Sequence, residues 1–147
     1  MKPTVAALMG ALAALGCSGA SSSGPTVANV AGTWSYTADN LAAGNGVTCD
    51  IVNVTMVLDQ NGSTFTGTYA NAELQCLVNG VEQDQGPYNG NVVNGVVNGD
   101  QVTFDFDTPA WTNSGAISGS SMSGPASVNV AVGETTYTLT GTWDATF

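Results

Sequence analysis

Apolar and polar residues alternate with a period of two along most of the chain after residue 30. The C-terminal segment 136–147 shows this best, because threonine and aspartate alternate there with apolar or small residues. Successive side chains of a β-strand point to opposite faces, so the pattern predicts strands with one apolar face. Nine runs follow it: residues 32–38, 47–58, 63–70, 73–78, 90–97, 102–107, 111–118, 122–132 and 136–147. The adjacent apolar residues Ile51 and Val52 interrupt the second run and predict a β-bulge there.

Asn-Gly pairs punctuate the runs, at residues 45–46, 61–62, 79–80, 89–90, 94–95 and 98–99. Both residue types tolerate the positive φ that tight two-residue hairpins require. The pairs that begin at residues 61, 79, 89 and 98 fall between runs and therefore predict hairpins there. Connections this short leave no room for a parallel crossover, so the sequence predicts an antiparallel meander.

The ends of such a meander are exposed edges unless the first strand pairs with the last. Both end runs carry the tripeptide Gly-Thr-Trp, at residues 32–34 and 141–143. Glycines on the apolar face, at Gly67, Gly115, Gly124 and Gly141, suit a strongly bent sheet. We therefore predict an all-β fold, an up-and-down barrel of about eight strands, with a two-sheet β-sandwich as the alternative.

The N-terminal segment has the features of an export signal. Lys2 precedes an apolar run over residues 4–15, which is shorter than the ~20 residues that span a bilayer. The following tetrapeptide, Ala14-Leu15-Gly16-Cys17, resembles the lipobox of bacterial lipoproteins, whose cysteine is acylated and becomes the first residue. Residues 1–16 are then a signal-peptide helix, and Cys17 is the lipidation site. Ordinary cleavage after Ala20 is the alternative.

A Ser/Gly-rich stretch over residues 18–25 has no apolar content to bury and is typical of a flexible tether. The expected organisation is a signal peptide (1–16), a lipidated cysteine with its tether (17–30) and a β-barrel domain (31–147). The lipoprotein resemblance implies a cell-envelope location, and Ser18 after the cysteine implies the outer membrane of a two-membrane bacterium. The membrane is therefore an expected partner, through the lipid.

Charge and composition exclude several function classes. Lys2 is the only cation, the chain has 11 acidic residues and no histidine, and the formal net charge is −10. Nucleic-acid binding needs cations for the phosphates, and catalytic triads or Schiff bases need histidine or lysine. Asp105 and Asp107 lie two apart, as paired carboxylates of a glycosidase or a Ca²⁺ site would, but the pattern points both to solvent. We expect no enzyme, cofactor, metal or nucleic acid.

With Cys17 assigned to lipid, Cys49 and Cys76 remain. Two cysteines of an exported protein can pair in an oxidising compartment, and we predict that they do. A closed loop of about 28 residues would stabilise the fold by roughly 3.5 kcal/mol. Two buried free thiols are the alternative.

Three segments carry a resemblance to avidin and lipocalin-type barrels: residues 32–34, 61–69 and 139–143. The chain as a whole resembles small bacterial lipoproteins of that architecture. The avidin family places an asparagine or similar polar group two residues after the first tryptophan, where this chain has Tyr36. The resemblance therefore implies the barrel fold but does not carry the biotin site.

Aromatic residues dominate the predicted inward face: Trp34, Tyr36, Phe65, Tyr69, Phe104, Phe106, Trp111, Tyr137 and Trp143. They are the candidate ligand-binding residues, because an eight-stranded barrel can hold one small apolar molecule. The same rings can instead fill the barrel as an ordinary core. Asn94 and Asn113 lie on or near this face and would orient a ligand or cap a bulge.

Three hypotheses for function follow. The first is an exported, lipid-anchored, non-catalytic barrel that binds a small apolar ligand. The second is a filled barrel that acts as a structural or surface interaction module. The third is an integral outer-membrane barrel, although Gly67 and Asn94 interrupt its lipid face and many runs are shorter than the ~9–11 residues that span a membrane.

Overall fold

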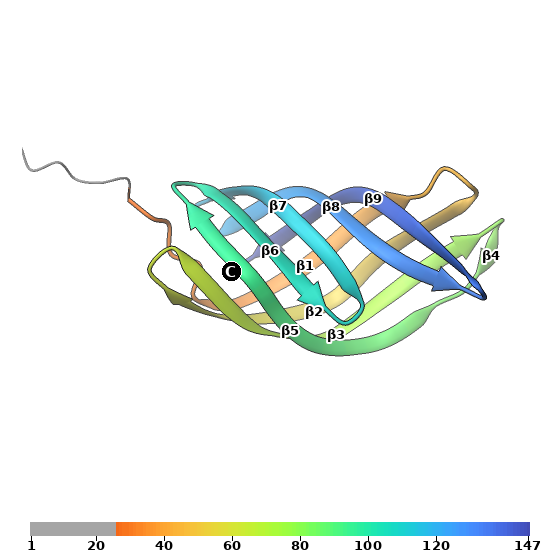
Figure 1. Cartoon of the computed structure of the whole chain (residues 1–147), viewed down its shortest axis with the longest axis horizontal. Helices are drawn as coiled ribbons and strands as arrows, with labels where there is room; N and C mark the ends of the chain where they lie inside the picture. Colours follow the sequence, from red (N-terminus) through yellow and green to blue (C-terminus); the bar gives the residue numbers. More distant parts are fainter. Residues whose placement is uncertain (1–25) are drawn as a thin grey trace, which may run out of the picture.

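The computed structural model describes residues 26–147, which form a closed antiparallel β-barrel of eight strands (Figure 1). These residues form nine strands, of which all but β4 belong to the barrel: β1 (Gly32–Ala42), β2 (Val47–Asn61), β3 (Thr64–Val78), β4 (Val81–Glu82), β5 (Gln85–Asn98), β6 (Gln101–Asp107), β7 (Ala110–Ser118), β8 (Ser121–Val132) and β9 (Thr135–Thr146). The two-residue strand β4 pairs only with β3 and lies outside the cylinder. Within residues 26–147, no helix is long and apolar enough to cross a membrane. The predicted signal peptide, Cys17 and residues 18–25 lie outside the described residues.

The barrel closes where β1 pairs with β9, the two strands that carry Gly-Thr-Trp. In this seam Tyr36 lies opposite Ala145, and Ala38 lies opposite Trp143. On its other side β1 pairs with β2, and β2 pairs with β3, so each of the eight strands has two neighbours. The predicted meander and its closure are confirmed, and the sandwich alternative is wrong.

Two predicted strand boundaries were wrong, one of them because asparagine with positive φ serves in bulges as well as in turns. The runs 63–70 and 73–78 form one continuous strand, β3, in which Asn71 (φ 62°) bulges without ending the ladder. The pair Asn89-Gly90 lies inside β5 and makes no hairpin. By contrast, Asn79 (φ 53°) and Gly80 (φ 82°) form the predicted tight turn.

Four strands contain a bulged asparagine with positive φ: Asn40, Asn53, Asn71 and Asn94. The extra residue of β2 lies between Ile51 and Val54 in its pairing with β1, which confirms the predicted bulge to within a residue. Bulges bend a strand and increase its twist. They occur in β1, β2, β3 and β5, one continuous half of the barrel, and so help to curl the sheet.

Glycine allows the other half of the barrel to close tightly between β7 and β8. A Cβ atom on Gly124 would collide with the backbone oxygen of Ser114, and one on Gly115 with the backbone oxygen of Ser123. The two strands therefore approach more closely here than any residue with a side chain allows. This is the role predicted for glycines on the apolar face.

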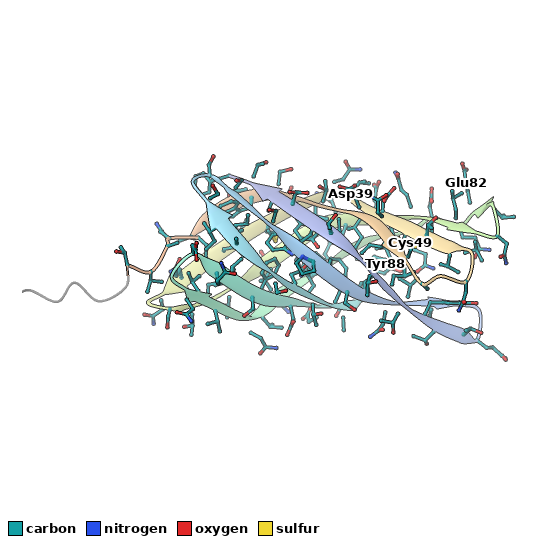
Figure 2. All side chains as sticks on the ribbon, turned by 90° about the horizontal axis from the view of Figure 1, so that it is seen from above. Asp39, Cys49, Glu82 and Tyr88 are labelled. Atoms are coloured by element: carbon teal, nitrogen blue, oxygen red, sulfur yellow. A yellow bond between two sulfur atoms is a disulfide. The ribbon has the colours of Figure 1, made fainter. Side chains whose placement is uncertain are left out.

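The apolar faces of the strands point into the barrel and form a single core of 29 buried residues. Threonine, serine, asparagine and aspartate cover the outside, and in Figure 2 Asp39 and Glu82 lie on that outer surface. Few large apolar side chains are exposed on this surface: Val27, Val57, Leu77, Val81, Val96 and Phe147. The sidedness predicted from the period-two pattern is confirmed.

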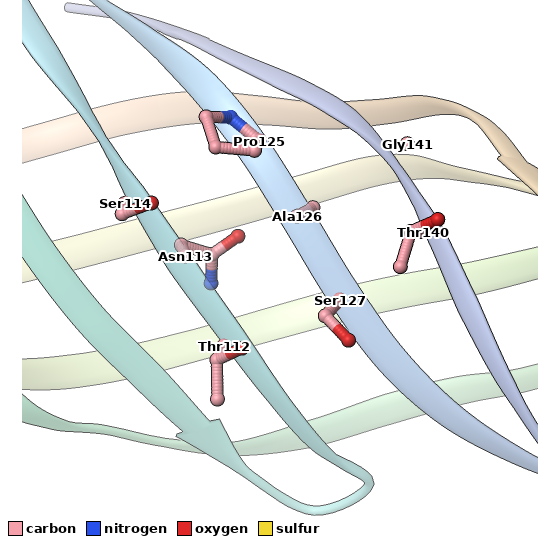
Figure 3. A pocket seen from close by; sticks show the side chains of 8 residues that line it. All are labelled: Thr112, Asn113, Ser114, Pro125, Ala126, Ser127, Thr140 and Gly141. Atoms are coloured by element: carbon pink, nitrogen blue, oxygen red, sulfur yellow. The ribbon is translucent and has the colours of Figure 1, made fainter.

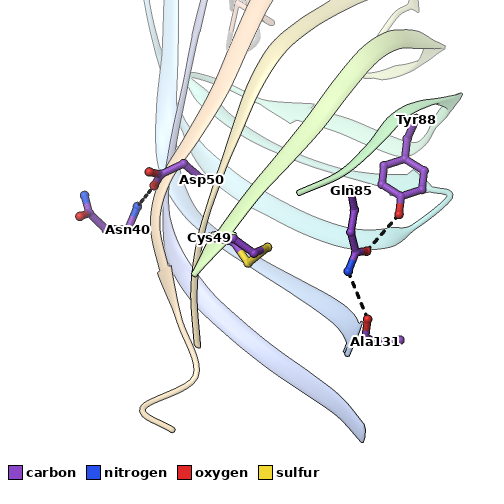
Figure 4. Close-up of a disulfide and its surroundings, with 7 residues drawn as sticks. Asn40, Cys49, Asp50, Gln85, Tyr88 and Ala131 are labelled. Atoms are coloured by element: carbon purple, nitrogen blue, oxygen red, sulfur yellow. Dashed lines mark hydrogen bonds between the residues drawn. A yellow bond between two sulfur atoms is a disulfide. The ribbon is translucent and has the colours of Figure 1, made fainter. Parts of the chain in front are cut away.

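A disulfide joins Cys49 of β2 to Cys76 of β3, as predicted. The two residues lie directly opposite each other in the ladder, and both are buried in the core (Figure 4). The bond therefore connects two neighbouring strands from inside the barrel.

The chain before β1 is fastened to the barrel. Val30 is fully buried, and its N–H donates to Oε1 of Gln60 at 2.6 Å. The N–H of Ala28 donates to the carbonyl oxygen of Gly99 at 3.2 Å. Both residues belong to the segment that the sequence analysis assigned to the tether, so the part of the chain packed on the barrel begins at Ala28.

Candidate functional site

The nine aromatic residues predicted to face inward do line the interior of the barrel. Eight of them are at most 2% exposed, and Tyr137 is half-buried and packs against the core. They come from five different strands, β1, β3, β6, β7 and β9, whose alternation brings them to one inner face. The aromatic-lined interior is therefore the candidate functional site.

Aromatic rings fill this interior by packing on one another. The ring of Phe106 lies in the middle, with its centroid 4.4–5.5 Å from those of four neighbours: Tyr36, Tyr69, Phe104 and Trp111. Tyr36 also stacks on Trp143, with 5.8 Å between centroids and 17° between planes. Edge-to-face and offset contacts of this kind are the favoured arrangements of aromatic pairs. The packing is that of a protein core rather than of a ligand cavity.

One polar cluster lies within the aromatic core. The hydroxyl of Tyr36 on β1 donates to Oδ1 of Asn113 on β7 at 2.8 Å, and Asn113 is only 4% exposed. Burial raises the pKa of Tyr36 far above its ordinary value, and the nearby indole of Trp111 opposes that shift. The inward position of Asn113 agrees with the sequence analysis, but its bond to Tyr36 was not predicted. Its only signal was an asparagine at an inward position between Trp111 and Gly115.

The three tryptophans differ in how their indole N–H groups are satisfied. Nε1 of Trp34 donates to the carbonyl oxygen of Val30 at 2.9 Å, and Nε1 of Trp143 donates to that of Ser114 at 2.9 Å. Nε1 of Trp111 and Nδ2 of Asn113 are both buried and have no acceptor among the described residues. Most buried polar groups in proteins are hydrogen-bonded, so this pair is exceptional.

At the end of the barrel that carries the β6–β7 turn, the first residues of β5 have no backbone hydrogen bonds to β6, and side chains form hydrogen bonds there instead. The pairing of β5 with β6 begins only at Val92, although β5 begins at Gln85. Here the hydroxyl of Tyr88 donates to Oε1 of Gln85 at 3.1 Å, and Nε2 of Gln85 donates to the carbonyl oxygen of Ala131 on β8 at 3.3 Å (Figure 4). The first bond lies within β5 and orients the Gln85 side chain, and the second connects β5 to β8 where β5 has no backbone pairing with β6.

Tyr69 lies near the same end, where its hydroxyl donates to the carbonyl oxygen of Thr108 in the β6–β7 turn. Burial, and to a smaller degree the carboxylate of Asp107, raise the pKa of Tyr69 to about 12. The hydroxyl is therefore a donor at neutral pH and holds the turn against β3.

The paired aspartates of β6 have structural partners. Asp107 is exposed, and its carboxylate accepts bonds of 2.8 Å from both the backbone N–H and Nδ2 of Asn91, which lower its pKa. The carboxylate of Asp105 accepts a bond of 2.7 Å from Nδ2 of Asn94. Asn94 itself is exposed and bulged, so its expected place near the inward face was wrong while its role in a bulge is confirmed. Within residues 26–147, no group of three or more acids or cysteines is placed to hold a metal ion.

Five hollows open onto the outer surface of the barrel. One crosses β7, β8 and β9, and its lining combines Asn113, Ala126 and Gly141 with small or hydroxylated outward side chains: Thr112, Ser114, Pro125, Ser127 and Thr140 (Figure 3). Another, beside β4, is lined by the carboxylates of Asp50, Glu82 and Asp84. All five are partly open to solvent.

No protein-family model, curated protein or solved structure matches this chain.

Proposed function

We propose that the chain is a non-catalytic, lipid-anchored protein of the bacterial cell envelope, whose filled barrel serves as a structural or surface interaction module. The observation that carries this proposal is the packed aromatic interior around Phe106. The residues that were candidates for a ligand pocket occupy that space themselves, which favours the interaction module over a barrel that binds a small apolar ligand.

The anchoring part of the proposal rests on the sequence before the barrel. The lipobox-like tetrapeptide that ends at Cys17 is followed by a Ser/Gly-rich stretch, and the packed chain begins shortly afterwards, at Ala28. The hydroxyl-rich exterior supports an anchored barrel over an integral one, because a transmembrane barrel needs an apolar outer belt. From the resemblance to avidin and lipocalin-type barrels, the proposal takes the barrel architecture and no ligand.

The surface charge indicates which partners the module would accept. Residues 26–147 carry all 11 acidic side chains of the chain, and the single cation, Lys2, lies before them. Such a surface repels nucleic acids and anionic lipid headgroups and attracts cationic partners over about a Debye length. The absence of histidine, and of any lysine or arginine after Lys2, also supports a non-catalytic role, because common acid–base and nucleophilic mechanisms depend on them.

Expression of the full chain and of Cys17→Ser in a two-membrane bacterium tests the anchor. We expect the parent chain in the membrane fraction with a diacylglyceryl mass on Cys17, and the variant in the periplasmic fraction. The matched control is the double variant Cys49→Ala/Cys76→Ala, which keeps the lipobox and should stay with the membrane. Equal partitioning of the parent and the Cys17→Ser variant would contradict the anchor.

Native mass spectrometry and tryptophan fluorescence of the purified full chain test the filled interior. We expect the bare mass of the lipidated polypeptide, and an emission maximum that apolar probes such as fatty acids or retinoids leave unchanged. A stoichiometric small molecule that co-purifies and quenches the buried tryptophans would restore the ligand-binding hypothesis.

A further inference from the structure

Two donor groups in the barrel interior lack an acceptor, and both belong to β7. Trp111 and Asn113 lie two residues apart on the inward face, and they are 1% and 4% exposed. Nε1 of Trp111 and Nδ2 of Asn113 have no partner among the described residues. Because a buried N–H loses its bonds to water on folding, a donor of this kind normally has an acceptor close by.

The other two indoles of the barrel follow that rule. Trp34 and Trp143 both donate to backbone carbonyl oxygens at 2.9 Å. The indole N–H groups of these two buried tryptophans are therefore both hydrogen-bonded to the backbone. Trp111 differs, since it lies among the rings of Tyr69 and Phe106 and beside the polar cluster of Tyr36 and Asn113.

Reorienting the amide does not remove the surplus of donors. As assigned, Oδ1 of Asn113 accepts from the Tyr36 hydroxyl, and its amide N–H groups remain free. Exchanging the amide oxygen and nitrogen would pair an N–H with the Tyr36 oxygen but would leave the Tyr36 hydroxyl without its acceptor. The Tyr36 oxygen lies beside the Trp111 indole but makes no hydrogen bond of normal geometry with it. In either orientation at least one donor of the cluster therefore lacks an acceptor, so what completes it must accept hydrogen bonds.

Size and charge restrict that acceptor. The rings of Tyr69, Phe106 and Trp111 pack with their centroids 4.4–5.6 Å apart beside the cluster, so only a small group fits there. An anion is disfavoured, because burying a charge without a counter-charge is costly and the barrel lacks a cationic side chain to pair with it. The raised pKa of Tyr36 reflects the same cost. A neutral oxygen atom meets both conditions.

We propose that Trp111 Nε1 and Asn113 Nδ2 form a buried binding site for one neutral oxygen acceptor. A water molecule supplies such an oxygen, and so does the carbonyl or ether oxygen of a small apolar molecule. The site does not depend on the proposed function. Water would leave the filled-barrel module intact, whereas a small molecule would replace it with ligand binding.

Indole N–H signals of the ¹⁵N-labelled full chain test the proposal. Three such signals are expected, and the variants Trp34→Phe, Trp111→Phe and Trp143→Phe assign them. If Trp111→Phe does not fold, the remaining two variants assign its signal by elimination. We expect the Trp111 proton to give a nuclear Overhauser cross-peak to a water signal or to protons of a bound molecule. The internal control is Trp143, whose N–H already bonds to Ser114 and should give no such cross-peak.

A second variant links the cross-peak to the site. Asn113→Leu removes one of the two donors, and we expect the Trp111 cross-peak to be lost while the signals of Trp34 and Trp143 keep their positions. The matched control is Ser127→Ala, which changes an outward residue near Asn113 in the hollow of Figure 3 and should leave the cross-peak unchanged.

Native mass spectrometry of the same sample distinguishes the two sources. A bare polypeptide mass with a Trp111–water cross-peak identifies water. An added mass that is released on unfolding and contacts Trp111 identifies a small molecule. A Trp111 N–H with neither contact, or a cross-peak that survives Asn113→Leu, overturns the proposal.

Discussion

The indole nitrogen of Trp143 on β9 donates a hydrogen bond of 2.9 Å to the backbone carbonyl oxygen of Ser114 on β7. Strand β8 lies between these two strands, so the bond passes across the inside of the barrel. Asn113 pairs with Ala126 and Ala116 pairs with Ser123, so the register of β7 and β8 places Ser114 across from Pro125, which has no N–H to donate. The side chain of Trp143 thus replaces a backbone bond that proline removes.

Replacing Trp143 should therefore lower the free energy of unfolding by more than the loss of side-chain volume alone would. We expect Trp143→Phe to lower the free energy of unfolding by about 2 kcal/mol or more, because the Ser114 carbonyl loses its donor and the core loses ring atoms. Urea unfolding followed by far-ultraviolet circular dichroism measures the change. A loss below about 0.5 kcal/mol, the usual range for surface substitutions, would mean that the bond does not contribute to stability.

Asn53 of β2 allows backbone conformation and side-chain bonding to be separated. It has φ 63°, and its Nδ2 donates to Oε2 of Glu73 at 2.9 Å on the exposed face. We expect Asn53→Ala to lower the free energy of unfolding by about 1 kcal/mol more than Asn53→Gly, because only glycine adopts a positive φ without strain. Both variants lose the bond to Glu73. The difference between their free energies of unfolding, measured by urea unfolding, therefore gives the energy of the positive φ alone. Equal stability of the two variants would show that the bulge can relax.

The same asparagines show how far the sequence predicts the fold. Period-two alternation and the two Gly-Thr-Trp segments predicted the barrel and its closure, because both reflect local strand chemistry and the burial of one face. The boundary near Asn71 was wrong, since the local preference of asparagine for positive φ is the same in a turn and in a bulge. What decides between them is a partner on another strand: the N–H of Asn71 bonds to Oδ1 of Asn89.

The barrel interior shows how much of the candidate site could be predicted from the sequence. The aromatic lining could be predicted residue by residue, because alternation alone decides which rings face inward. The bond between Tyr36 and Asn113 joins residues 77 positions apart, and it depends on which strands of the closed barrel face each other across the axis. The sequence alone could not show whether the rings leave a cavity either, since that depends on their mutual packing.

Alkaline pH should destabilise the barrel through Tyr69. Its pKa is about 12 in the folded protein, above the value of about 10 in an unfolded chain, so the native state holds the phenolic proton more tightly. The resulting stabilisation is complete below pH 10 and is lost as the pH rises from about 10 to about 12. We expect the urea midpoint to fall over that range, and the fall to be smaller in Tyr69→Phe.

Absorbance at 295 nm measures the tyrosinate directly in the same samples. A phenolate step near pH 12 that disappears in Tyr69→Phe would identify this residue. If Tyr69 ionised at its ordinary pKa in the folded barrel, its burial near the β6–β7 turn would not be the cause of the alkaline instability.

Reduction of the Cys49–Cys76 disulfide should lower stability without opening the barrel. The bond closes a loop with a sequence separation of 27 residues, for which the loop-entropy relation gives a stabilisation of about 3.5 kcal/mol. The ladder between β2 and β3 continues on both sides of the bond, for two residue pairs toward Val47 and along most of the two strands toward Asn61, so the native sheet should persist when the bond is absent. We expect the urea midpoint to fall when tris(2-carboxyethyl)phosphine is added, while the circular dichroism of the folded state keeps its strand signature.

The double variant Cys49→Ala/Cys76→Ala serves as the control, because it should be equally destabilised and indifferent to the reductant. A parent chain whose midpoint does not respond to complete reduction, verified by thiol counting, would show that strand pairing and aromatic packing alone set the stability of this barrel.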